Sequence, residues 1–192
     1  MNTAGLGACT AVPRVLMIAA GIGGSRMEHQ ERIWFVDPAT LQDVVVDRAA
    51  LEARLDGSSD LDRVWVLSLL GRGEEAVSEA RALLTSFMDP FRSLLVLGYA
   101  YQRLYRWRDA ARAQEKALRA AHTRVREGQA RHQIGRRLFD EGLYLAAAAE
   151  FDWAGDLFKA AGRSRTALTS HHARDRARRA HLHSRFSDQK DR

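Results

Sequence analysis

The chain has 192 residues, of which 46% are hydrophobic and 28% are charged. This length and composition suit one globular domain whose core is large enough to be stable without disulfide bonds. Its single cysteine, Cys9, excludes an internal disulfide and a cysteine-based zinc site. The net charge is +6, and residues 163–192 account for all of it, because they hold nine Lys/Arg against three Asp. The rest of the chain is balanced in charge, so the net charge does not indicate that the whole domain binds nucleic acid.

The first segment, residues 1–31, contains a short apolar stretch, VLMIAAGIGG, behind Arg14. This pattern resembles a poor signal peptide. The apolar stretch is far too short to cross a bilayer. We therefore expect 1–31 to be disordered, or to be an upstream extension before a true start at Met27. A lone cysteine fits a reducing compartment, so the sequence favours a cytoplasmic location.

The next segment, residues 32–56, begins with a stretch rich in β-branched and aromatic residues, RIWFVDPATLQDVVVD. It favours a hairpin or an irregular segment, although Asp37 and Pro38 could equally be an N-cap followed by the first residue of a helix. A short helix is expected from Asp47 to Leu55. The DGSSD stretch then breaks the chain, and Ser58 or Ser59 can cap the following helix.

Residues 57–162 read as three successive helix pairs. The turns within the pairs fall at Gly71, Tyr105 and Gly142, which are spaced by 34 and 37 residues. A small residue early in each second helix follows the same spacing: Ala76, Ala110 and Ala147. Self-similarity with a period of this length predicts stacked helix-hairpin repeats.

The second pair carries the most specific pattern, Leu94-x-x-Leu97-Gly98-x-x-Tyr101, followed by alanines at 110 and 117. The third pair shows Ile134-Gly135-x-x-Leu138 and then Ala147-x-x-x-Phe151. Over residues 57–161 the chain resembles the tetratricopeptide-repeat (TPR) family. The resemblance implies an all-α fold of antiparallel helix-hairpin repeats, a TPR-like α-solenoid, with a C-terminal capping helix and a small irregular N-terminal segment.

Two glycines and two departures refine this expectation. Gly98 and Gly135 lie where the first helix of a pair presses on the second, so a larger side chain would hold the backbones apart. The first pair has Arg63 where the family has leucine and Val64 where it has a small residue. Its first helix is therefore the least well specified of the six.

The resemblance also implies a function, because TPR-like repeats present a concave surface lined by the first helix of each pair. Arginine can grip a carboxylate through two hydrogen bonds while aromatic side chains hold apolar anchors. The sequence therefore favours a non-catalytic scaffold or adaptor that binds a protein or peptide partner of acidic character. Tyr99 is expected to be exposed on this surface, whereas Tyr101 and Trp107 are expected in the core. The candidate partner-binding residues are Trp65, Arg92, Tyr99, Gln102, Arg103, Gln129, His132 and Arg136.

Residues 163–192 form a basic C-terminal helix and tail. We expect it to cap the third pair, with Ala167, Leu168, Ala173 and Ala177 facing inward. The alternative function is that of a nucleic-acid-associated regulator that uses this tail. Self-association of the repeats is a third interpretation.

Catalytic signatures do not occur in the sequence. It contains no Walker loop, His-Glu-x-x-His motif, nucleophile elbow or dinucleotide-binding glycine pattern. We therefore expect neither enzymatic activity nor a cofactor, metal site or membrane partner. The lysine, asparagine and arginine clamp by which some TPR proteins hold chaperone tails is also absent.

Overall fold

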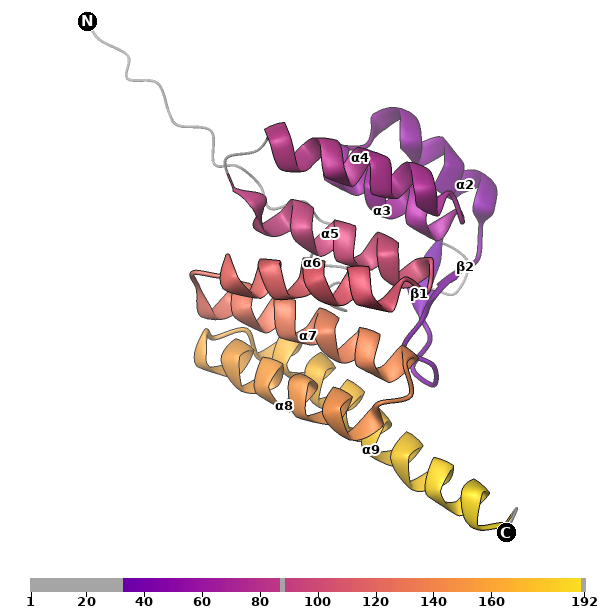
Figure 1. The fold of residues 1–192 in the computed structure, drawn as a ribbon, viewed down its shortest axis with the longest axis vertical. Coiled ribbons are helices and arrows are strands. Elements are labelled where there is room, and N and C mark those ends of the chain that lie inside the picture. The colour runs from indigo at the N-terminus through magenta and orange to yellow at the C-terminus, as the bar shows by residue number, and fades with distance from the viewer. Residues whose placement is uncertain (1–32, 87–88, 191–192) are drawn as a thin grey trace, which may run out of the picture.

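The computed structural model describes residues 33–86 and 89–190, with side chains described as far as Arg185. This part of the chain is all-α apart from one two-stranded hairpin (Figure 1). In chain order its elements are β1 (Trp34–Val36), β2 (Asp43–Val45), α2 (Arg48–Ala53), the 3-10 turn η1 (Arg54–Gly57), α3 (Asp60–Leu69), α4 (Gly73–Ser86), α5 (Pro90–Arg103), α6 (Trp107–Arg119), α7 (Arg124–Asp140), α8 (Tyr144–Ala160) and α9 (Ser164–Lys190). The expectations for residues 1–31 lie outside the described residues.

Side-chain caps fix where several helices begin. Asp47 accepts a hydrogen bond from the backbone of Ala50 at the start of α2, and Ser59 caps α3. Asp89 caps α5, whose first residue is Pro90. Each cap satisfies a backbone N–H that the helix itself leaves without a partner. Of the two caps that the sequence left open for α3, Ser58 and Ser59, the structure uses Ser59.

The turns between paired helices share one backbone conformation. Gly71, Tyr105 and Gly142 all have positive φ, at 81°, 57° and 78°, and Gly162 ends α8 with φ 71°. This left-handed geometry favours glycine and costs other residues energy. The alignment of Tyr105 with two glycines is thus confirmed, and Tyr105 is the member of the set that carries a side chain in the strained region.

Two close helix contacts depend on glycine. A Cβ atom on Gly98 of α5 would lie 2.9 Å from Cγ of Gln114 on α6. A Cβ atom on Gly135 of α7 would lie 2.8 Å from Cδ1 of Phe151 on α8. The predicted contacts of the first helix of each pair with the second are therefore confirmed for α5–α6 and α7–α8.

The helices stack one after another along the long axis, and the hairpin lies at one side of the stack (Figure 1). Each helix from α3 to α8 packs on its successor, and two further contacts join α3 to α5 and α5 to α7. Apolar clusters fill the contacts between helices, the largest of them joining α3, α4, α5 and α6. No helix in 33–86 or 89–190 combines the length and apolar character needed to cross a membrane.

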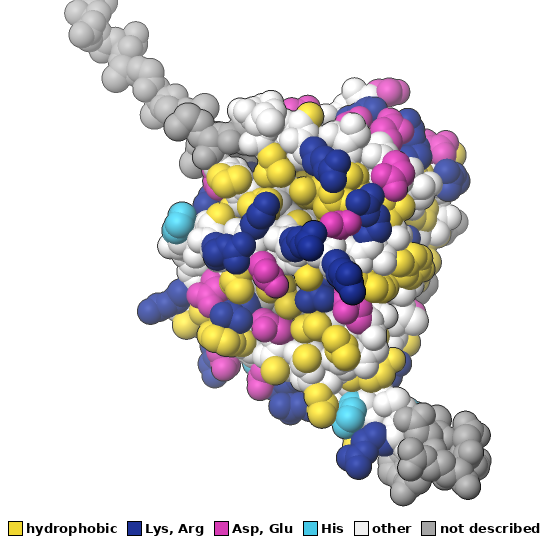
Figure 2. All heavy atoms as spheres, in the orientation of Figure 1, with side chains coloured by type: hydrophobic (Ala, Val, Ile, Leu, Met, Phe, Trp, Pro, Cys, Tyr) yellow, Lys and Arg dark blue, Asp and Glu magenta, His cyan; other side chains and the backbone are white. Residues whose placement is uncertain are grey.

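One face of the stack carries charges of both signs (Figure 2). Lys and Arg side chains gather near its middle, with Asp and Glu side chains among them. On α6 the cations Arg108, Arg112, Lys116 and Arg119 are exposed, while Arg106 pairs with Asp109 at 2.9 Å. The mixture gives this face no continuous surface of one sign.

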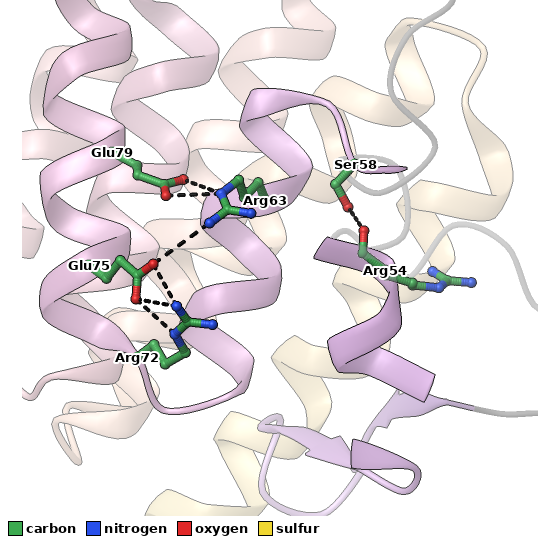
Figure 3. A network of polar contacts seen from close by, with 6 residues as sticks. All are labelled: Arg54, Ser58, Arg63, Arg72, Glu75 and Glu79. Atoms are coloured by element: carbon green, nitrogen blue, oxygen red, sulfur yellow. Dashed lines mark hydrogen bonds and ion pairs between the residues drawn. The ribbon is translucent and has the colours of Figure 1, made fainter. Parts of the chain in front are cut away.

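Helix α3 forms despite the two departures in its sequence. Val64 is fully buried in the main apolar cluster with Ala76. Nε of Arg63 donates to both carboxylate oxygens of Glu79 on α4, at 3.0 and 3.1 Å, and the neighbouring Arg72 binds Glu75 (Figure 3). An ion pair therefore joins α3 to α4 where the repeat pattern would place a leucine.

The last helix, α9, packs on α8 and runs beyond it (Figure 1). Ala167, Ala173 and Ala177 are buried as expected, and Ser170 is buried between them. The expectation for Leu168 is wrong, because this side chain is 58% exposed. At 100° per residue, Leu168 lies on the opposite side of the helix from Ser170.

Candidate functional site

The candidate site is the face of α3, α5 and α7 on which the hairpin lies. Tyr99 of α5 and Arg136 of α7 both point to Asp43 of β2. The Tyr99 hydroxyl donates to Oδ2 of Asp43 at 2.8 Å, and Nη2 of Arg136 donates to the same oxygen at 2.6 Å. The carboxylate of the hairpin is therefore held from two helices at once.

Alternation along β2 places Asp43 against the helices. Successive strand residues point to opposite faces, so Asp43 and Val45 share one face and Val44 lies on the other. Asp43 is 5% exposed and Val45 is partly buried, whereas Val44 is 38% exposed. The strands pair antiparallel, with Trp34 opposite Val45 and Val36 opposite Asp43.

The central ion pair of the site is buried, and its two charges compensate one another. The side chains of Arg136 and Asp43 are 5% and 0% exposed. Burial opposes the charge of Arg136, but the Asp43 carboxylate beside it raises the pKa of the guanidinium. Burial, reinforced by the Asp43 charge, raises the pKa of Tyr99 well above its usual value, so the phenol stays a hydrogen-bond donor.

A second carboxylate, that of Asp140, also acts on the Arg136 guanidinium. Nε2 of Gln102 on α5 donates to Oδ2 of Asp140 on α7 at 2.6 Å. Burial raises the pKa of Asp140, and hydrogen bonds from Gln102 and from Gln42 of the hairpin, with the charge of Arg136, oppose that rise. The hairpin thus contributes to both polar groups of the site.

Apolar contacts flank the polar centre on each side. Trp34 of β1 packs edge-on against Trp65 of α3, with ring centroids 4.6 Å apart. At the other end, Leu41 packs against the cluster that contains Phe139 of α7. Its backbone carbonyl also accepts a hydrogen bond from Nη2 of Arg136 at 2.9 Å. The hairpin is therefore bound through apolar anchors around a buried carboxylate.

The hairpin also reaches α9, where Nε of Arg176 donates to the Ala39 carbonyl. Hairpin residues thus contact α3, α5, α7 and α9. We term the face formed by Trp65, Tyr99, Gln102 and Arg136 the covered surface.

Four of the eight predicted partner-binding residues make up this covered surface. The prediction that Tyr99 is exposed is wrong, because the hairpin leaves it 3% exposed. His132 is buried as well, but its Nδ1 lies 3.0 Å from Oγ of Ser170 on α9 and its ring packs near Phe151. The binding role of these residues stays a prediction.

The other three predicted residues, Arg92, Arg103 and Gln129, are partly exposed. Arg92 precedes Tyr99 by seven residues and Gln129 precedes Arg136 by seven. Because two helical turns take about seven residues, each lies on the same helix face as its partner, about 10 Å nearer the N-terminus. Arg103 is close enough for its charge to oppose the rise in the pKa of Asp140.

Sequence reasoning missed Asp43, the residue on which the site converges. A usable signal was present: a single acidic residue opens the run Asp43-Val-Val-Val, where the strand pattern would bury a side chain. A buried carboxylate requires a cationic or hydrogen-bonding partner. The sequence nevertheless does not say which of its many arginines supplies that partner.

The basic tail is partly neutralised within the fold. Arg174 pairs with Asp152 of α8 at 2.7 Å and with Asp175 at 2.9 Å, and Arg178 lies 3.7 Å from Asp152. Arg176 is bound to the hairpin. Three of the tail's arginines, Arg174, Arg176 and Arg178, therefore have partners in the described part of the chain.

No group of three or more His, Cys, Asp or Glu side chains that could hold a metal ion occurs among the described residues. The comparisons with known proteins give no relative: no family model matches the chain, and no match was found among curated proteins or solved structures.

Proposed function

We propose that the chain is a TPR-like α-solenoid that acts as a non-catalytic protein-binding scaffold, and that the covered surface is its concave binding face. The observation that carries the proposal is the convergence of Tyr99 and Arg136 on one carboxylate. A charge-assisted pair of hydrogen bonds in a buried setting recognises a carboxylate specifically. The ligand is accordingly an extended protein segment with an acidic residue between apolar ones.

Residues beyond the hairpin extend the same surface. Arg92 and Gln129 lie two turns before Tyr99 and Arg136 and remain partly exposed. They can contact a ligand in the present conformation, whereas Arg136 is too deeply buried for charge reversal without disturbing the fold. Arg92 is therefore the residue by which to test the function.

The test is a random peptide library selected on the purified full-length chain. We expect the selected peptides to be enriched in Asp and Glu next to apolar residues. Arg92→Glu should weaken their binding at least fivefold, because a like charge then faces the peptide carboxylate. Arg112→Glu is the matched control, since it reverses an exposed arginine on α6. Equal losses of peptide affinity in the two variants would contradict the proposal, and so would selected peptides that lack acidic residues.

A further inference from the structure

We infer that the hairpin, residues 33–46, is an internal ligand of the covered surface, and that the scaffold's partner is a protein segment of the same chemistry that displaces it. The inference rests on the proposed function and adds the partner's binding mode. The partner segment is extended, carries an aspartate flanked by apolar residues, and places that aspartate between Tyr99 and Arg136, where Asp43 lies in the free protein.

The hairpin depends on the surface beneath it. Its strands have three residues each, and their backbone pairing joins Trp34 to Val45, Phe35 to Val44 and Val36 to Asp43. A two-stranded hairpin of this size is at best marginally stable alone in water. Its contacts with the helices therefore hold it in place, and a competitor for those contacts can release it without unfolding the helices.

The hairpin fits the surface incompletely. Oδ1 of Asp43, Nε1 of Trp65 and Oε1 of Gln102 are buried and have no hydrogen-bond partner in the described part of the chain. A buried polar atom without a partner lowers the stability of the contact that buries it. A partner segment that satisfies the Trp65 and Gln102 atoms would bind this surface more tightly than the hairpin does.

Release of the hairpin changes the charge of the surface in favour of such a partner. The departing segment removes the Asp43 carboxylate from Arg136 and the Ala39 carbonyl from Arg176. The charge of Arg103 also acts on Asp140, a carboxylate that stays beside Arg136. The opened surface therefore gains positive potential and attracts an acidic segment.

The connection of the hairpin to the body favours another protein over a second copy of this chain as the occupant. Only Val46 and Asp47 separate β2 from α2, and α2 is anchored on α3 through the fully buried Leu51. Exchange of hairpins between two copies would need α2 to detach as well. Displacement by a partner needs only a swing of the hairpin about two residues.

A peptide with the hairpin's own sequence, residues 33–46, is the probe for this competition. Its affinity is measured for the full-length wild type and for Asp43→Asn, Trp34→Ala and Val44→Ser chains. The peptide can bind only those molecules whose hairpin has left the covered surface, so its apparent affinity is reduced by that fraction. A variant that loosens the hairpin increases this fraction and must bind the peptide more tightly. We expect at least tenfold tighter binding to Asp43→Asn and Trp34→Ala.

Two controls accompany the measurement. Val44→Ser changes a side chain that faces away from the helices. The Val44→Ser chain should therefore bind the peptide with the affinity of the wild type. A peptide with Asn in place of Asp43 should bind every chain at least tenfold more weakly than the parent peptide. Trp34→Ala leaves Asp43 and Arg136 intact, so it decides the outcome if Asp43→Asn fails to fold.

The outcomes separate the inference from the proposed function. If the peptide binds all four chains equally and in an aspartate-dependent manner, the binding face stands and the internal-ligand inference is overturned. If circular dichroism shows the loosened chains folded and neither the peptide nor acidic library peptides bind them, both fail. A wild type that light scattering shows to be a dimer, and that Trp34→Ala converts to a monomer, makes a second copy the occupant and also overturns the inference.

Discussion

Single residues decide how the site is built. Tyr99 and Arg136 were predicted as partner-binding residues from their positions on helices, a property of local sequence. Asp43 was not predicted, because it lies 56 residues from Tyr99 and 93 from Arg136. Local pattern shows which side chains share a face, but not which distant segment covers that face. The exposure predicted for Tyr99 failed for this reason.

Gly135 tests the close approach of α7 and α8. Gly135→Ala places a Cβ atom 2.8 Å from the buried ring of Phe151, which has little room to move. Overpacking of this kind costs about 2 kcal/mol of unfolding free energy, measurable by urea denaturation. The control Gly57→Ala, where a Cβ meets no atom within 4 Å, should stay within about 0.5 kcal/mol of wild type. Similar losses in both variants would contradict the close packing.

His132 gives the fold a pH dependence. Burial, with a contribution from the charge of Arg136, lowers the pKa of His132 from 6.5 to about 3. Between these values the unfolded chain binds a proton that the folded chain does not. Stability contributed by the neutral ring is therefore present above pH 6.5 and is lost as the pH falls toward 3, by about 1.4 kcal/mol per pH unit.

His132→Gln should remove this loss. Urea denaturation at several pH values between 7 and 4 gives the unfolding free energy of each chain. As the pH is lowered, this free energy should fall less steeply for His132→Gln than for the wild type. His172→Gln, at an exposed position of α9, should leave the wild-type slope unchanged. A His132→Gln chain with the wild-type slope would show that the ring is protonated in the folded state.

At the level of elements, the helices were predictable because their signals are local. The caps at Asp47, Ser59 and Asp89 and the turns at Gly71 and Gly142 determine where helices begin and end. The inward face of α9 was harder to predict, because alanines and serines alternate with arginines and give little apolar contrast. The error at Leu168 follows from that weak pattern.

The division of α9 into a packed part and a projecting part can be tested by substitution and truncation. Ala177 is fully buried against α8, so Ala177→Glu should cost about 3 kcal/mol or more of unfolding free energy. Leu168→Glu, at an exposed position of the same helix, should cost less than about 0.5 kcal/mol. Removing residues 182–192 should also have little effect, since Leu182 and Arg185 are exposed. Large destabilisation by the truncation would show that the end of α9 packs in solution.

As a whole, the molecule combines a helix stack with a hairpin that lies on the covered surface. The helices are joined by extensive neighbour-to-neighbour packing, whereas the hairpin is held by fewer contacts, centred on Asp43, Trp34 and Leu41. Elements held by few contacts open at lower free energy than the core. We therefore predict one stable body of helices and one displaceable segment, the hairpin.

Native-state hydrogen exchange, with and without the 33–46 peptide, tests this claim most directly. In the hairpin the backbone N–H of Val46 bonds to the Ile33 carbonyl, and that of Asp37 to the Gln42 carbonyl. With saturating peptide we expect these amides of the chain to lose at least tenfold of their protection, while amides of α5 and α7 stay protected. Hairpin amides that keep full protection while the peptide is bound would contradict the account.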